Sequence, residues 1–185
     1  MYKPYGDEVV EEVVEHHEAN GGISRFEKFK IYHESFLNKK IDEDGVVQLA
    51  KEFSSLVMQK VVDSPYVTGV FEFLDANYEA YDFFISTGTP TGEIEMILNQ
   101  KDIRKYFKKV YGSPEKKTSH VEKILLANQY SRDEIVFIGD ALTDRDAARN
   151  NNIAFIGRYT TTEEIKKEEY LIDDFVEFDN FLNKL

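Results

Sequence analysis

The sequence contains no cysteine and no tryptophan, only four prolines, and fewer basic than acidic residues. Without cysteine, disulfides and thiolate metal sites are excluded, which favours a cytoplasmic protein. No apolar run approaches the roughly 18 residues that cross a bilayer, so we expect no membrane partner. The net charge of −12 argues against a nucleic-acid partner, because neutralising phosphates requires clustered lysines and arginines. A small anionic ligand is compatible with this net charge, since its binding needs only a few local cations.

The first third of the chain is predicted to be helical. Residues 7–18 have the valine spacing of an amphipathic helix that ends at Asn20-Gly21-Gly22. Ser24 and Glu27 form a capping-box pattern that opens a second helix. A third helix is expected after Asp44, which is interpreted as its N-cap, and Ser64-Pro65 ends it near residue 62.

The rest of the chain alternates short apolar runs with helical stretches. Strands are predicted at 81–85, 109–111, 135–138 and 153–156, and helices at about 90–99, after 117, at 145–151 and at 161–167. This alternation is typical of βαβ units and a parallel sheet. The predicted fold is therefore a Rossmann-like α/β core at 67–185 with an α-helical domain at 1–66.

Polar residues follow the predicted strands at the positions where parallel sheets bind ligands. The turn at Ser86-Thr87-Gly88 offers a hydroxyl and backbone N–H groups to a phosphate oxygen, although an ordinary capped turn would look the same. Lys117, at the start of a helix, could neutralise a phosphate, with a surface lysine as the alternative. Arg25 could meet an anionic substrate, or lie on a solvated helix face.

Two carboxylates lie after the strand at 135–138. Asp140 follows Gly139 directly, and Asp144 lies one helical turn later. Carboxylates at this spacing can converge on one hard cation, and Mg²⁺ prefers oxygen ligands while keeping several waters. The alternative is that Asp140 only caps the helix. The sequence therefore predicts a magnesium site at these two residues.

The order of these pieces resembles motifs two, three and four of the haloacid dehalogenase (HAD) superfamily, in its phosphoglycolate phosphatase and β-phosphoglucomutase-like branch. The helical first part resembles the cap domain of that branch. The resemblance implies that Ser86 binds the transferred phosphoryl group, with Thr87 and Gly88 adding backbone donors. Lys117 would hold the phosphate, with Lys116 the weaker candidate. Asp140 would bind Mg²⁺ directly, and Asp144 through water or as a second ligand.

One motif of the family has no match in this sequence. Family members begin with a strand that ends in Asp-x-Asp-Gly, whose first aspartate attacks phosphorus and whose second acts as acid and base. Asp42-Glu43-Asp44-Gly45 has this spelling but follows a polar segment between two helices, so we interpret it as a helix start. We expect the chain to lack the central strand, leaving its neighbours about 9–10 Å apart.

The predicted function is a Mg²⁺-dependent phosphatase for a small phosphate monoester, with sugar phosphates among the candidates. Its chemistry would proceed through an aspartyl-phosphate, and the nucleophile would be absent from this chain, which alone is expected to be inactive. Two alternatives stay open: a truncated, inactive HAD-like protein that binds phosphate or Mg²⁺, and a sugar-phosphate mutase. The expected partner is a small phosphorylated metabolite, and the incomplete sheet predicts self-association.

Overall fold

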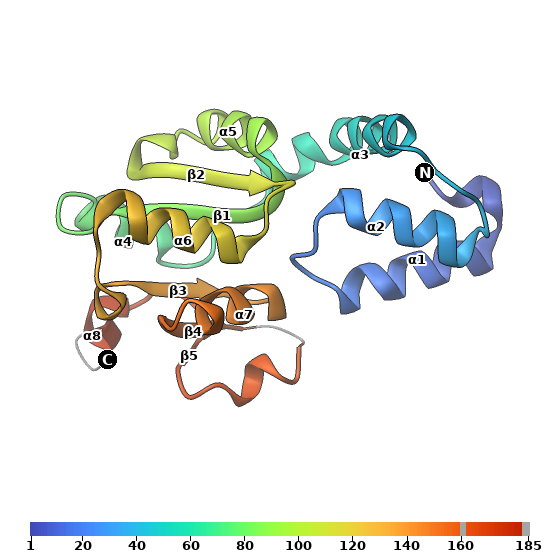
Figure 1. The fold of residues 1–185 in the computed structure, drawn as a ribbon. Coiled ribbons are helices and arrows are strands. Elements are labelled where there is room, and N and C mark those ends of the chain that lie inside the picture. Colours follow the sequence, from blue (N-terminus) through green and yellow to red (C-terminus); the bar gives the residue numbers. More distant parts are fainter. Residues whose placement is uncertain (160–161, 183–185) are drawn as a thin grey trace.

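The computed structural model describes residues 1–159 and 162–182 and has two parts (Figure 1). The first part is helical and the second is a layered α/β arrangement. The arrowheads of the strands point toward the helical part, so the carboxyl ends of the strands meet it. The predicted α/β class with a helical cap is confirmed.

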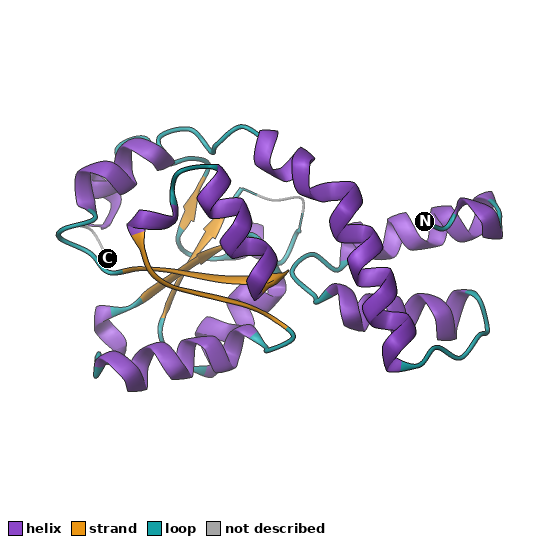
Figure 2. Ribbon diagram, turned by 90° about the horizontal axis from the view of Figure 1, so that it is seen from above, coloured by secondary structure: helices purple, strands orange, loops and turns teal. Residues whose placement is uncertain are grey.

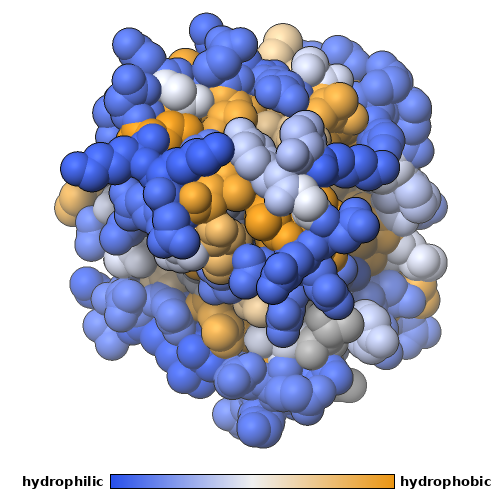
Figure 3. All heavy atoms as spheres, turned by 90° about the vertical axis from the view of Figure 1, so that its right-hand side faces the viewer, coloured by the Kyte–Doolittle hydropathy of each residue, from blue (hydrophilic) through white to orange (hydrophobic). Residues whose placement is uncertain are grey.

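The helical part, called the cap below, is built from three main helices. They are α1 (Asp7–Ala19), α2 (Arg25–Ile31) and α3 (Glu43–Asp63), with a short 3-10 turn at Lys3–Tyr5 and a π-helical turn at Tyr32–Phe36. Phe29, Tyr32, Val46 and Ala50 form its buried core. Viewed from the cap side, hydrophilic side chains surround an apolar patch near the centre of the surface (Figure 3).

The α/β part, called the core domain, follows α3. Its elements are α4 (Val70–Asn77), β1 (Phe83–Pro90), α5 (Thr91–Gln100), β2 (Phe107–Ser113), α6 (Lys117–Asn128), β3 (Val136–Gly139), α7 (Leu142–Asn150), β4 (Ala154–Arg158), β5 (Leu171–Ile172) and α8 (Phe178–Leu182). Short 3-10 turns precede β2, β3 and β5. Helices lie on both sides of the strands (Figure 2).

The strands form two parallel sheets instead of one. β1 pairs with β2, and β3 pairs with β4, which pairs with β5. In the described part of the chain, no ladder joins β1 to β3. In the view of Figure 1, α6 is drawn between these two strands. Phe83 of β1 and Ile138 of β3 nevertheless pack against the same buried cluster. The two sheets therefore share a core without sharing hydrogen bonds.

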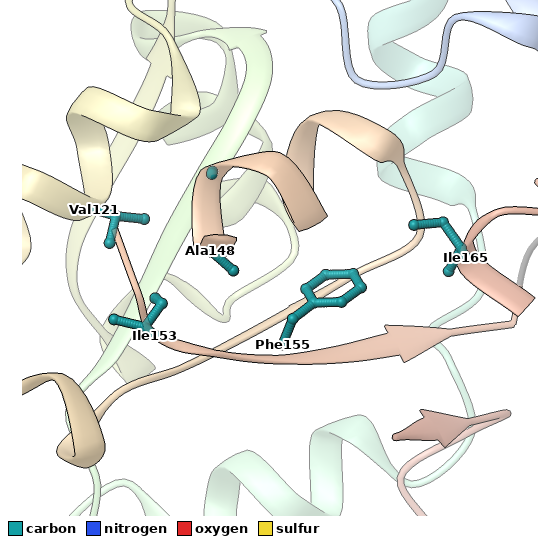
Figure 4. Packing of buried hydrophobic residues seen from close by; sticks show 6 residues of the cluster. Val121, Ala148, Ile153, Phe155 and Ile165 are labelled. Atoms are coloured by element: carbon teal, nitrogen blue, oxygen red, sulfur yellow. The ribbon is translucent and has the colours of Figure 1, made fainter. Parts of the chain in front are cut away.

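A second cluster holds α6 and α7 against β4. Val121, Ala148, Ile153 and Phe155 pack together there, and Ile165 closes the cluster (Figure 4). Ala148 and Ile165 are completely buried. This packing places the N-terminal ends of α6 and α7, which carry Lys117 and Asp144, beside the end of β3.

Three local predictions differ from the structure. Asp42, not Asp44, caps α3, because Asp42 has extended backbone angles and its Oδ1 accepts from the Gly45 N–H at 2.8 Å. β1 continues through Pro90 where a turn was predicted after Ile85, because Ser86 and Pro90 find partners on β2. The helix predicted at 161–167 is only a 3-10 turn at Ile165–Lys167, and Thr161 lies outside the described residues.

Candidate active site

Two pockets lie where the strand ends meet the cap. One, of about 370 Å³, is lined by residues that include Asn20, Gly21, Asp140, Leu142 and Asp146. The other, of about 280 Å³, is lined by residues that include Gly22, Thr87, Gly88, Ser113 and Lys117. Ile23, Thr143 and Asp146 line both pockets. The turn between α1 and α2 thus forms a wall that the pockets share with the core domain.

Gly22 brings this turn into contact with the site. Its φ is +80°, and a Cβ at Gly22 would lie 2.2 Å from Thr143 Oγ1 and 3.1 Å from Lys117 Nζ. A Cβ at Gly88 would in turn lie 2.9 Å from the Gly22 carbonyl oxygen. Only glycine fits such a conformation and such a close approach without strain. The sequence showed Gly21-Gly22 as the end of a helix and gave no sign of this contact.

Lys117 and Asp144 form a buried ion pair at the centre of the site. Lys117 Nζ lies 2.5 Å from Asp144 Oδ1, and the two side chains are 11% and 7% exposed. Asp144 Oδ2 accepts from the Ala141 N–H at 3.2 Å. Burial raises the pKa of Asp144, an effect that the Lys117 charge and this hydrogen bond oppose. The pair therefore holds the ammonium group of Lys117 in a fixed position beside the 280 Å³ pocket.

Asp140 differs from Asp144 in its exposure. It lies just beyond the end of β3, its side chain is 55% exposed, and Arg158 Nη2 lies 3.4 Å from its Oδ2. Its charge raises the pKa of Asp144, so the two carboxylates interact. The structure therefore brings together the two residues predicted as metal ligands.

The donor set at these residues fits a magnesium ion. Mg²⁺ is commonly bound by one or two carboxylates together with waters and substrate phosphate. Among the described residues, no group of three or more histidine, cysteine or acidic side chains could hold a metal by itself. Asp140 would be the direct ligand because its carboxylate is exposed, whereas both oxygens of Asp144 already accept hydrogen bonds.

Two hydroxyl groups near the pockets have no hydrogen-bond partner. Ser113 Oγ and Thr143 Oγ1 are buried and unpaired in the described part of the chain. Buried polar groups are normally satisfied by protein, water or a ligand. Both residues line the 280 Å³ pocket, so their unpaired hydroxyls are a second observation that favours a polar ligand here.

Ser86, Thr87 and Gly88 lie in the extended end of β1. Thr87 and Gly88 line the 280 Å³ pocket, and Thr87 Oγ1 accepts from the Thr89 N–H at 3.2 Å. The Ser86 hydroxyl lies 2.8 Å from His120 Nδ1. The predicted phosphate-binding turn is therefore the end of a strand. Thr87 and Gly88 reach the 280 Å³ pocket, whereas Ser86 contacts His120 and is not among the residues that line either pocket.

Arg25 is engaged away from the two pockets. Its guanidinium donates to both carboxylate oxygens of Glu93, at 2.8 and 3.0 Å, and to Ser54 Oγ at 2.8 Å. Glu93 lies on α5 and Ser54 on α3, so this cluster joins the cap to the core domain. The role of Arg25 in substrate binding stays a prediction. Glu93 was not identified from the sequence, because its partner lies 68 residues away.

His120 is a second residue near the site that was not identified from the sequence. It lies one turn after Lys117 on α6 and is completely buried, and its ring stacks on Tyr111 with centroids 5.4 Å apart. Burial lowers the pKa of His120, whereas the nearby Glu115 carboxylate raises it. The only signal in the sequence was the three-residue spacing from Lys117, which places both side chains on one helix face.

Together the fold and the site define a class of protein. It is a parallel α/β protein with a lysine and two carboxylates at its strand ends, beneath a helical cap. The chain belongs to the haloacid dehalogenase-like hydrolases, whose family pattern matches residues 8–158. This family includes phosphatases and sugar-phosphate mutases, in agreement with the resemblance found in the sequence.

Solved structures share the fold at low sequence identity. A predicted phosphoglycolate phosphatase from Haemophilus somnus is 20% identical, with a TM-score of 0.71, over 89% of this chain and 80% of that one. A predicted phosphatase from Clostridium acetobutylicum is 19% identical, with a TM-score of 0.72, over 89% and 79%. The β-phosphoglucomutase of Clostridium difficile is 21% identical, with a TM-score of 0.71, over 88% and 77%. No curated protein matches the chain.

In the described ranges, 1–159 and 162–182, every helix is too short or too polar to cross a bilayer. The cytoplasmic location stays a prediction.

Proposed function

We propose that this protein is a magnesium-dependent phosphatase acting on a small phosphate monoester, with sugar phosphates among the candidates. The observation that carries the proposal is the buried Lys117–Asp144 pair beside the exposed carboxylate of Asp140. A lysine held in this way is a fixed positive charge for a phosphoryl group. The unpaired hydroxyls of Ser113 and Thr143 supply further donors nearby.

Each residue of the proposed site has a distinct role. Lys117 would neutralise the bound phosphoryl group, and Ser86 would donate to one of its oxygens. Asp140 would hold the magnesium ion, with Asp144 orienting Lys117 and completing the metal environment. A bound Mg²⁺ supplies charge that stabilises the transferring phosphoryl group. The Gly21-Gly22 turn would exclude water while the pocket is occupied.

The attacking aspartate is proposed to come from outside residues 1–185. Asp140 and Asp144, the two predicted carboxylates after β3, are assigned to the metal and to Lys117. Asp42, the other candidate for the nucleophile, is the N-cap residue of α3 in the helical domain. Residues 1–185 alone are therefore proposed to bind phosphate and Mg²⁺ without turnover.

Isothermal titration with inorganic phosphate in the presence of MgCl₂ tests the site. Lys117→Met should weaken binding by roughly tenfold or more, because it removes a charged hydrogen bond. Lys105→Met is the matched control, since Lys105 is exposed and lines neither pocket, and should bind nearly as wild type does. Asp140→Asn should remove the magnesium dependence of binding. An absence of phosphate binding by the wild type would overturn the proposal.

Hydrolysis of p-nitrophenyl phosphate tests the assignment of the nucleophile. Residues 1–185 are expected to show no turnover with Mg²⁺. Turnover that is lost in Asp42→Asn would mean that the helix-capping aspartate is the nucleophile, and the assignment would then be wrong.

A further inference from the structure

The contact between Ser86 and His120 joins the end of β1 to the first turn of α6. Ser86 Oγ lies 2.8 Å from His120 Nδ1. The imidazole ring is completely buried, and it stacks on Tyr111 of β2 at an interplanar angle of 27°. A ring enclosed in this way has little freedom to turn, so Nδ1 stays directed at the serine.

A serine hydroxyl has only one proton to donate. If Nδ1 carries no proton, Ser86 must donate its proton to His120, and only lone pairs are left for a ligand. Phosphoryl oxygens are acceptors, so such a serine would repel them. If Nδ1 carries a proton, His120 donates to Ser86 Oγ, and the Ser86 proton is free for a phosphoryl oxygen. The position of one proton on His120 therefore decides whether Ser86 can bind phosphate.

The surroundings of the second ring nitrogen, Nε2, favour a ring that is protonated on both nitrogens. Nε2 is buried without a hydrogen-bond partner in the described part of the chain, and Glu115 Oε2 lies 3.8 Å from it. The second oxygen of Glu115 pairs with Lys123 at 2.5 Å. A neutral ring with its proton on Nδ1 would direct the Nε2 lone pair at the Glu115 carboxylate. A doubly protonated ring satisfies Ser86 and Glu115 together.

Several neighbouring groups oppose or favour a positive charge on the His120 ring. Burial lowers the pKa of His120, and the Lys123 and Lys117 charges lower it further, whereas Glu115 and the Gly112 backbone raise it. Tyr111 faces the ring by stacking. A phosphate dianion beside Lys117 would offset the lysine charge and favour the protonated ring. Phosphate binding should therefore be accompanied by uptake of a proton from solvent.

We propose that His120 is a positioning residue, which donates from Nδ1 to Ser86 Oγ and so frees the Ser86 hydroxyl to donate to a phosphoryl oxygen. This inference rests on the proposed function, because it requires a phosphoryl group at Ser86. It adds a residue to the site that touches neither the ligand nor the metal and controls a residue that does.

Phosphate titration of a matched set of variants tests the role. His120→Phe keeps a ring against Tyr111 but removes the donor that holds Ser86 Oγ, so the serine hydroxyl samples about three staggered rotamers and phosphate binding should weaken about threefold. His120→Asn places an amide N–H near the position of Nδ1 and should bind phosphate as tightly as wild type, since the donor is retained. In a Ser86→Ala background, His120→Phe should have no further effect, because the partner is absent.

Proton uptake supplies a second readout that a packing role would not change. Titrations near neutral pH in two buffers of different ionisation enthalpy should reveal uptake in the wild type and none in His120→Asn. Equal phosphate affinity of wild type and His120→Phe, or equal uptake in wild type and His120→Asn, would overturn the inference while leaving the phosphate site intact. If the wild type binds no phosphate, the proposed function fails as well, so the two failures are distinguishable.

Discussion

Replacing Glu93 by glutamine should destabilise the protein by about 3–5 kcal/mol, the usual effect of removing one partner of a buried ion pair. The side chains of Arg25 and Glu93 are 11% and 6% exposed. Glu93 accepts two hydrogen bonds from Arg25, and a third from Ser54 at 2.5 Å. A glutamine keeps one oxygen but directs an NH₂ group at the guanidinium. Arg25 would then be a buried charge without an anionic partner, left with the Ser54 hydroxyl and with the Phe53 ring, whose centroid lies 4.8 Å from its Cζ.

Urea unfolding followed by circular dichroism gives the free energy of unfolding and its dependence on denaturant. Glu43→Gln is the matched control, because Glu43 pairs with Lys30 at the surface, with side chains 81% and 41% exposed. Screening by solvent limits the effect of that change to less than about 1 kcal/mol. The double variant Arg25→Met/Glu93→Met should recover much of the loss, since no charge is left buried. A Glu93→Gln variant as stable as the control would refute the reasoning.

Three further predictions concern stability and assembly. Asp144→Asn should leave Lys117 as a buried charge without its anionic partner, as Glu93→Gln does for Arg25. It should therefore melt at a lower temperature than wild type at pH 7 in calorimetry, and an equal or higher melting temperature would contradict this. Gly22→Ala should lose about 1–3 kcal/mol in urea unfolding through its positive φ and its clash with Thr143. Gly21→Ala, whose Cβ would lie 3.9 Å from its nearest neighbour, should change little, and equal effects would refute the argument. Finally, the free edges of β1 and β3 should cause concentration-dependent association in sedimentation velocity, and a single monomeric species at all concentrations would count against it.

The helices of the cap could be predicted because their signals are local. Apolar residues recur at helical spacing, and Asn20-Gly21-Gly22 and Ser64-Pro65 end α1 and α3 close to the predicted positions. Asp44 was wrongly predicted as the N-cap residue of α3, because aspartate is a good N-cap residue at both position 42 and position 44. The choice between them depends on which residue adopts the extended backbone, which Asp42 does with ψ of 173°.

The apolar central residues of the strands allowed the strands to be predicted, but the positions at which the strands end could not be predicted. Ser86 to Pro90 has the composition of a turn, and only the pairing with Tyr111 and Ser113 on β2 makes it extended. That pairing depends on a contact between segments more than 20 residues apart, which local composition does not contain. The residues were nevertheless identified as part of the site, because strand ends of a parallel sheet meet at one edge.

The candidate site was predicted as separate residues, and the structure supplies the contacts between them. Lys117 and Asp144 were each identified from their position after a strand or at a helix start, but their ion pair was not. His120 and Glu93 were missed for a different reason. A single histidine or glutamate on a helix has no distinguishing pattern, and its role arises only from the partner that tertiary packing brings to it.

The exposure of β1 and β3 is explained by the separation of the two sheets. Strands of a parallel sheet that is covered on both faces are normally buried, yet every residue of β1 and β3 is only half-buried. Their side chains still share a core, since Phe83 and Ile138 pack with Phe73 and Phe178. What the two strands lack is pairing of their backbone groups, and unpaired edges are the part of a sheet that recruits another strand. Association is therefore expected at these edges.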